Sequence, residues 1–187
     1  MRWSRLFDDL EAQLLRLERV ELEAEVSERA RSERGQVAMA HALAADCGRE
    51  ISLDLLGVGR VMGVLRDVGQ DWCVLESPTQ GPRRSRAVLL ALPAVQSVTG
   101  LTSFVDQREG VSQRRFGMRS ALRALSRDRV QVRIHLTGGG TVQGTIDRVG
   151  RDHCDVAEHA DDAPRRGRDV RATHTVPLWA VAAVRQV

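Results

Sequence analysis

The stretch that decides the fold is Val130-Gln-Val-Arg-Ile-His-Leu-Thr-Gly-Gly-Gly-Thr-Val-Gln-Gly-Thr-Ile-Asp-Arg-Val-Gly-Arg-Asp-His-Cys-Asp-Val156. Apolar residues recur at every second position from Val130 to Leu136, which is the period of a strand with one buried face. The glycines at 138–140 supply a hairpin turn, and the alternation resumes around Gly144, a glycine that marks a bend within a strand. A further turn follows at 150–152. The stretch therefore predicts three short strands joined by tight turns.

The same pattern occurs a second time, earlier in the chain by about 81 positions. This shift aligns Gly57 with Gly138, Gly63 with Gly144, and Cys73 with Cys154. Both copies end in another apolar segment, residues 90–95 in the first and 176–181 in the second, each followed by a further valine. Each copy therefore predicts four or five short strands.

Residues 136–146, with their strand, glycine turn and strand around a second glycine, resemble the first motif of the Sm-like (LSm and Hfq-like) family. The resemblance covers both copies, and residues 118–125 match the short helix that precedes the first strand in that family. It implies an α+β fold, in which an N-terminal α-helical segment is followed by two tandem small five-stranded Sm-like β-barrels, each preceded by a short helix. The chain also resembles uncharacterised proteins of high-GC bacteria, which implies no activity.

The family resemblance does not extend to the residues that hold a base. RNA-binding members use an acidic residue and an asparagine in the turn after the second strand. That turn is Gly150-Arg-Asp-His153 here and Gly69-Gln-Asp-Trp72 in the first copy, and neither contains an asparagine. The resemblance therefore implies the fold without implying base capture.

The repeat and the flanking segments predict four parts. These are a helical N-terminal segment at 1–46, a first barrel at 47–101, a basic helical connector at 102–128 and a second barrel at 129–187. In the first part, apolar residues with a coiled-coil-like 4-3-4-3 spacing form a stripe that we expect to bind a partner. Either it packs on the barrels or it dimerises. The stripe consists of Trp3, Phe7, Leu10, Leu14 and Leu17.

Composition narrows the setting of the protein. The chain has no lysine, asparagine or tyrosine, which indicates a GC-rich bacterial genome and makes arginine abundance partly a matter of codon usage. Three cysteines without a leading apolar segment predict a reducing cytoplasm. The longest apolar run, residues 88–95, is far shorter than the ~20 residues of a membrane helix. We therefore expect a cytoplasmic protein with no membrane contact.

The motif Pro-Arg-Arg-x-Arg occurs at matching loop positions in both copies, at 82–86 and 164–168. Guanidinium groups suit phosphate recognition, and more arginines lie in the connector. The alternative is a pair of solvated loops rich in arginine through codon usage. The predicted nucleic-acid-binding residues are Arg83, Arg84, Arg86, Arg114, Arg115, Arg119, Arg165, Arg166 and Arg168.

No motif predicts catalysis, a metal or a cofactor. The cluster His153-Cys-Asp155 with His159 fails as a zinc site because consecutive strand residues face opposite sides. The equivalent cysteines Cys73 and Cys154 are predicted to be small core residues. We expect a non-catalytic nucleic-acid-associated or regulatory protein that contacts RNA or DNA backbone. The alternative is a protein-interaction scaffold or homo-oligomer that uses the N-terminal helix and the barrel edges.

Overall fold

The computed structural model describes residues 38–76, 87–102, 116–159 and 170–187. The chain divides into two compact units, residues 1–38 and 39–187. The predicted stripe at residues 3–17 lies outside the described residues, so the account below concerns the second unit.

The first half of this unit contains one short α-helix, five strands and a 3-10 turn. Glycines with positive φ, Gly57 at 73° and Gly59 at 81°, make the first hairpin turn, as the sequence predicts. The elements in chain order are α2 (Met39–Ala45), β1 (Glu50–Leu55), β2 (Gly59–Val68), β3 (Trp72–Glu76), β4 (Ala87–Ala91), η1 (Leu92–Ala94) and β5 (Val95–Thr99).

The second half repeats this order. Gly139, with φ of 86°, makes its first hairpin turn, and a Cβ at Gly144 would overlap the carbonyl of Ala157 on the next strand. Gly144 lies within a strand, as the sequence predicts, and the close approach of the neighbouring backbone is a further constraint on it. The elements are α3 (Met118–Arg127), β6 (Gln131–Leu136), β7 (Thr141–Val149), β8 (His153–Glu158), β9 (Ala172–Pro177), η4 (Leu178–Ala180) and β10 (Val181–Gln186).

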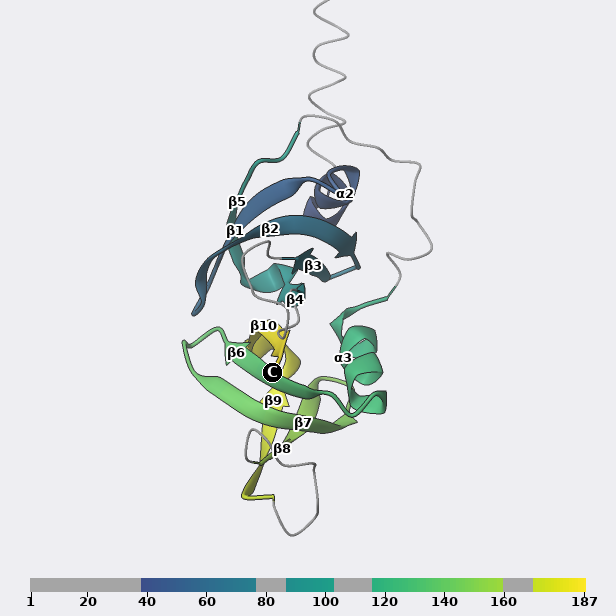
Figure 1. The fold of residues 1–187 in the computed structure, drawn as a ribbon, viewed down its shortest axis with the longest axis vertical. Coiled ribbons are helices and arrows are strands. Elements are labelled where there is room, and N and C mark those ends of the chain that lie inside the picture. The colour runs from purple at the N-terminus through teal and green to yellow at the C-terminus, as the bar shows by residue number, and fades with distance from the viewer. Residues whose placement is uncertain (1–37, 77–86, 103–115, 160–169) are drawn as a thin grey trace, which may run out of the picture. The chain divides into compact units, whose positions relative to one another are not determined.

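All ten strands belong to one antiparallel sheet with the order β5-β1-β2-β3-β4-β10-β6-β7-β8-β9. Within each half the last strand pairs with the first, so β5 lies beside β1 and β10 lies beside β6. The halves join because β4 also pairs with β10, the C-terminal strand drawn in yellow in Figure 1. We call this β4–β10 junction the seam.

The expected α+β fold of two tandem five-stranded Sm-like barrels is therefore wrong. The described residues form a single open ten-stranded sheet with only two short α-helices, of 7 and 10 residues. The physical reason is that the free edge of β4 takes its hydrogen bonds from β10 in the other half, so the first five strands do not close on themselves. A coiled coil is also contradicted by this sheet-rich structure.

The core follows the alternation read from the sequence. Val132 and Ile134 of β6 are fully buried, as are Leu53, Leu65 and Leu75 in the first half. These side chains belong to one apolar cluster that includes residues of both halves. Burial of this apolar surface is the main favourable contribution to folding, and here it is shared across the seam.

Candidate functional site

The structure describes only one of the predicted nucleic-acid-binding arginines. Arg119 is exposed on α3. The other eight, in the segments 77–86, 103–115 and 160–169, lie outside the described residues, as do the five stripe residues. Whether these side chains come together is therefore not tested, and both predictions remain predictions.

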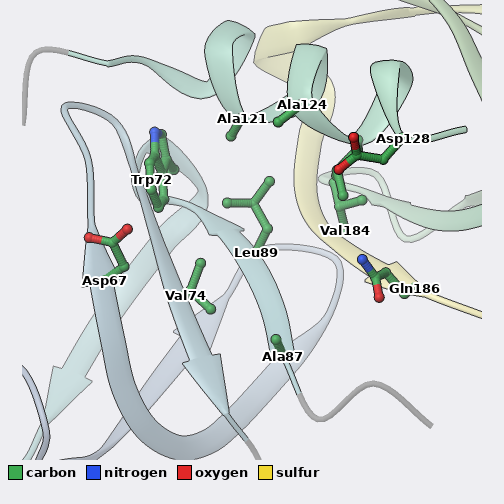
Figure 2. Close-up of a pocket in the computed structure, with 11 residues that line it drawn as sticks. Asp67, Trp72, Val74, Ala87, Leu89, Ala121, Ala124, Asp128, Val184 and Gln186 are labelled. Carbon is green, nitrogen blue, oxygen red and sulfur yellow. The ribbon is translucent and has the colours of Figure 1, made fainter. Parts of the chain in front are cut away.

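A hollow of about 260 Å³ lies between α3 and strands of both halves. Figure 2 shows Ala121 and Ala124 of α3 facing Leu89 of β4, with Asp67 and Asp128 on opposite sides. The small side chains of α3 leave this space because they do not reach the sheet. Its lining is mostly apolar, and it holds no cluster of groups arranged for catalysis.

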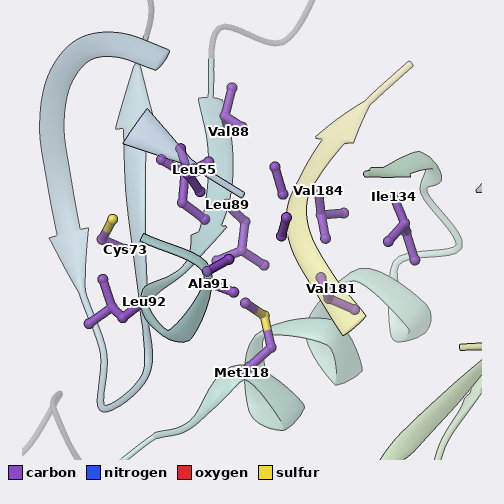
Figure 3. Close-up of a cluster of buried hydrophobic side chains, with 14 of the residues drawn as sticks. Leu55, Cys73, Val88, Leu89, Ala91, Leu92, Met118, Ile134, Val181 and Val184 are labelled. Atoms are coloured by element: carbon purple, nitrogen blue, oxygen red, sulfur yellow. The ribbon is translucent and has the colours of Figure 1, made fainter. Parts of the chain in front are cut away.

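The seam is the one strand pairing between the two halves in the described residues, and it is deeply buried. Ala183, Val184 and Arg185 of β10 stand opposite Leu90, Leu89 and Val88 of β4. Ala183 and Leu90 are completely buried, and Val184 is 3% exposed. Figure 3 shows Leu89 and Ala91 of β4 near Val181 and Val184 of β10, with Met118 of α3 in the same cluster.

The outermost strands β5 and β9 pair on one side only. Within the described residues no strand lies on their other sides, so each presents a row of main-chain donors and acceptors. Their side chains are more polar than those of the seam. Gln96, Ser97 and Thr99 are exposed on β5, and Thr173 and Thr175 are exposed on β9.

The two open edges are the structural equivalents of the two seam strands. Leu90 stands opposite Cys73, and Val176 stands opposite the equivalent Cys154, so β9 corresponds to β4. Val98 stands opposite Leu53, and Val184 stands opposite the equivalent Ile134, so β5 corresponds to β10. The chain therefore contains one formed junction and the two separate halves of a second.

A turn of the first half binds the start of α3. Asp71 Oδ1 accepts a hydrogen bond of 2.5 Å from the main-chain N–H of Met118. Trp72 Nε1 and the N–H of Gln70 both donate to the carbonyl of Phe116, at 2.8 and 3.2 Å. This arrangement requires glycine at position 69, since a Cβ there would overlap the indole of Trp72. The first half thus caps a helix that belongs to the second.

The equivalent turn of the second half has the same backbone but no such partner in the described chain. The N–H of Gly150 donates to the carbonyl of His153 at 2.8 Å, as that of Gly69 does to Trp72. Asp152 is exposed and bonds instead to Nδ1 of His153 at 2.8 Å. This hydrogen bond is the main reason why the pKa of Asp152 lies below its usual value.

The buried cysteines carry no reactive thiolate. Burial raises the pKa of Cys73 to about 12 and that of Cys154 to about 11, so both thiols are protonated at neutral pH. Both are fully buried, which confirms their prediction as core residues. In the described parts of the chain, no three histidine, cysteine or acidic side chains are placed to hold a metal ion.

Sequence reasoning missed the seam and the capping role of Asp71. One signal was present for the seam. Residues 88–91 and 181–184 are continuous apolar runs, and all four residues of each run are buried. Such runs are typical of strands covered on both faces, whereas strands at an edge are shorter or more polar.

The sequence matches no protein-family model, and neither a curated protein nor a solved structure matches it significantly. The resemblance of residues 136–146 to Sm-like proteins therefore stays a prediction. Among the described helices, none has the length and apolar character to span a membrane.

Proposed function

We propose that this chain is a non-catalytic protein-interaction module whose open edges β5 and β9 pair with a second copy of the chain. The observation that supports it is the seam itself. Strand β4 already pairs with β10, and their equivalents β9 and β5 are left without that pairing at opposite ends of the sheet. The interaction is strand addition, in which main-chain hydrogen bonds supply affinity.

The seam predicts the register of the intermolecular pair. Its partners Ala183 and Leu90 correspond to Ser97 and Val176, which would face each other across two copies. By the same shift Val98 would face Thr175, and Thr99 would face His174. Because the open edges are more polar than the seam, we expect an association that is reversible and weaker than the intramolecular junction.

The test is a register-specific cross-link. A Val98→Cys/Thr175→Cys variant, made in a Cys47→Ser background, places thiols opposite each other only when β5 of one copy pairs with β9 of another. Mild oxidation should then give dimers and larger covalent species on a non-reducing gel. The control pairs Val98→Cys with Thr173→Cys, a shift of about 6–7 Å along the strand. That shift places the Cα atoms beyond the ~7 Å that a disulfide tolerates.

Sedimentation of the unmodified protein provides the independent measurement. The proposal expects the mean mass to rise with protein concentration. A constant monomer mass together with equal cross-linking of both cysteine pairs would contradict it. The predicted N-terminal stripe is tested alongside by deletion of residues 1–35, because self-association that survives the deletion belongs to the edges.

A second candidate function is phosphate-backbone binding, the leading hypothesis from the sequence. The observation that favours it is a row of exposed arginines on α3, Arg119, Arg123 and Arg127, at the four-residue spacing of one helix face. Binding of mixed RNA and duplex DNA at about 50 and 200 mM salt tests it, since phosphate contacts weaken with salt. Six arginines are changed to glutamine in a test variant: Arg83, Arg84, Arg86, Arg165, Arg166 and Arg168. Loss of binding in this variant would support the predicted role of these arginines in nucleic-acid binding. A cytoplasmic location remains part of both proposals.

A further inference from the structure

Three basic side chains share one face of the adjacent strands β6 and β10. Arg133 stands directly opposite Arg185, and the next residue on this face of β6, His135, stands opposite Ala183. Residues directly opposite in an antiparallel pair have Cβ atoms about 4.5–5.5 Å apart, so two guanidinium groups arise from neighbouring positions. Like charges placed in this way destabilise a sheet unless something neutralises them.

No carboxylate of the described chain performs this neutralisation. Arg133 donates from Nε and Nη2 to the amide oxygen of Gln143, at 2.8 and 2.6 Å, and that acceptor carries no charge. Strand β4, the other neighbour of β10, contains no acidic residue. Asp147 of β7, the other neighbour of β6, pairs with Arg129 at 3.1 Å.

Two buried donors on the same face also lack an acceptor. Nε of Arg185 and Nε2 of Gln131 are inaccessible to solvent and have no hydrogen-bond partner among the described residues. Gln131 lies two residues before Arg133 on β6, so its side chain leaves the same side of the sheet. A buried donor without an acceptor costs about 1–3 kcal/mol. The inner side of this basic cluster is therefore unsatisfied in the described structure.

The electrostatics of His135 agree with this arrangement. Burial lowers the pKa of His135, and the nearby charges of Arg185 and Arg133 lower it further. In the described parts of the chain, no negative group offsets them. The imidazole is therefore mainly neutral at pH 7 in the free protein, and a bound anion would favour its protonated form.

We infer that Arg133, His135 and Arg185, with Gln131 at the side, form a binding site for a phosphate-class oxyanion at the exposed end of this face, where Arg133 is exposed and the neighbouring Ala183 is completely buried. Guanidinium groups match the geometry of phosphate oxygens through paired hydrogen bonds. The anion offsets the repulsion between the two positive charges. The site does not depend on strand pairing at β5 and β9, and it uses none of the arginines predicted from the sequence.

The experiment titrates the full-length protein with inorganic phosphate against sodium chloride at equal ionic strength. His135 ring protons, assigned with a His135→Gln variant, should shift in NMR spectra, and the pKa of His135 should rise. The thermal midpoint should increase by about 3–5 °C at ten times the dissociation constant. Arg185→Gln should abolish both effects, while the control Arg60→Gln, exposed on β2 and 3.9 Å from Asp54, should retain them.

A titration with a second ligand distinguishes the possible sources of the anion. A single-stranded oligonucleotide that binds more tightly than phosphate, with a salt dependence reduced in Arg185→Gln, would identify a nucleic-acid backbone. Binding of inorganic phosphate alone would identify a small phosphorylated molecule. No change in His135 or in the thermal midpoint up to about 100 mM phosphate, far above the range of specific sites, would overturn the inference. If Arg185→Gln folds poorly, Arg133→Gln serves instead, and the His135 titration of the unmodified protein still decides.

Discussion

The seam and the open edges are the same strand positions in two settings. At the seam, β4 and β10 carry Leu89 and Ala183. The equivalent positions on the edges carry Thr175 and Ser97. The fold is the same in both places, yet the buried junction is apolar and the exposed strands are polar. The difference shows that burial, rather than strand geometry, sets the side-chain chemistry of these positions.

The largest expected effect comes from placing a charge at each of two equivalent positions. Ala183→Lys puts an ammonium group at a completely buried site, and we expect a loss of roughly 3–5 kcal/mol in the free energy of unfolding. Ser97→Lys lies on an exposed edge opposite Asp54 and should change it by less than about 0.5 kcal/mol. Urea denaturation of the two variants gives the comparison. Equal losses would mean that the edge is as buried as the seam.

The two equivalent turns give a smaller contrast. Asp71→Ala removes the carboxylate that accepts from the N–H of Met118, and loss of a helix cap costs about 1 kcal/mol. Asp152→Ala removes an exposed carboxylate whose side-chain partner is the neighbouring His153, so we expect no measurable change in the urea midpoint. A larger loss in Asp152→Ala than in Asp71→Ala would show that the second turn also binds a helix.

The smallest expected effect is a shift in one titration. The hydrogen bond from His153 lowers the pKa of Asp152, so His153→Ala should raise it towards the ordinary value of about 3.9. Because the folded-state pKa is depressed, the linked stabilisation is present above about pH 4 and is lost as the pH falls through the folded pKa. The NMR shift of the Asp152 carboxyl carbon, followed across the acid range, measures this pKa. An Asp152 titration midpoint that is the same with and without His153→Ala would show that the hydrogen bond from His153 is not the cause of the lowered pKa.

The local structure was largely legible in the sequence, and the long-range pairing was not. Alternation from Val130 to Leu136 and the glycines at 57, 59 and 139 correctly located strands and turns, because these depend on nearby residues. The partner of β4 was misjudged, since alternation says which face is buried and not which strand lies alongside. The apolar run at 181–184 was the available hint that β10 is an interior strand.

The candidate sites were also difficult to predict from the sequence, because they depend on long-range pairing. Asp71 and Met118 are 47 positions apart, and Arg133 and Arg185 meet only through strand register. No spacing rule connects such residues. The predicted arginine loops were conspicuous because their residues are adjacent in sequence, yet the described structure leaves eight of those nine arginines outside its range.

The seam also has a consequence for the order in which the protein is made. Strand β10 follows β6 to β9 in the sequence, so the edge of β4 that faces away from β3 has no partner until the second half has been synthesised. Until then, this apolar edge is open to other nascent chains, which is the situation in which multi-part proteins misassemble. Synthesis of β10 is therefore the step that commits the first half to its final pairing.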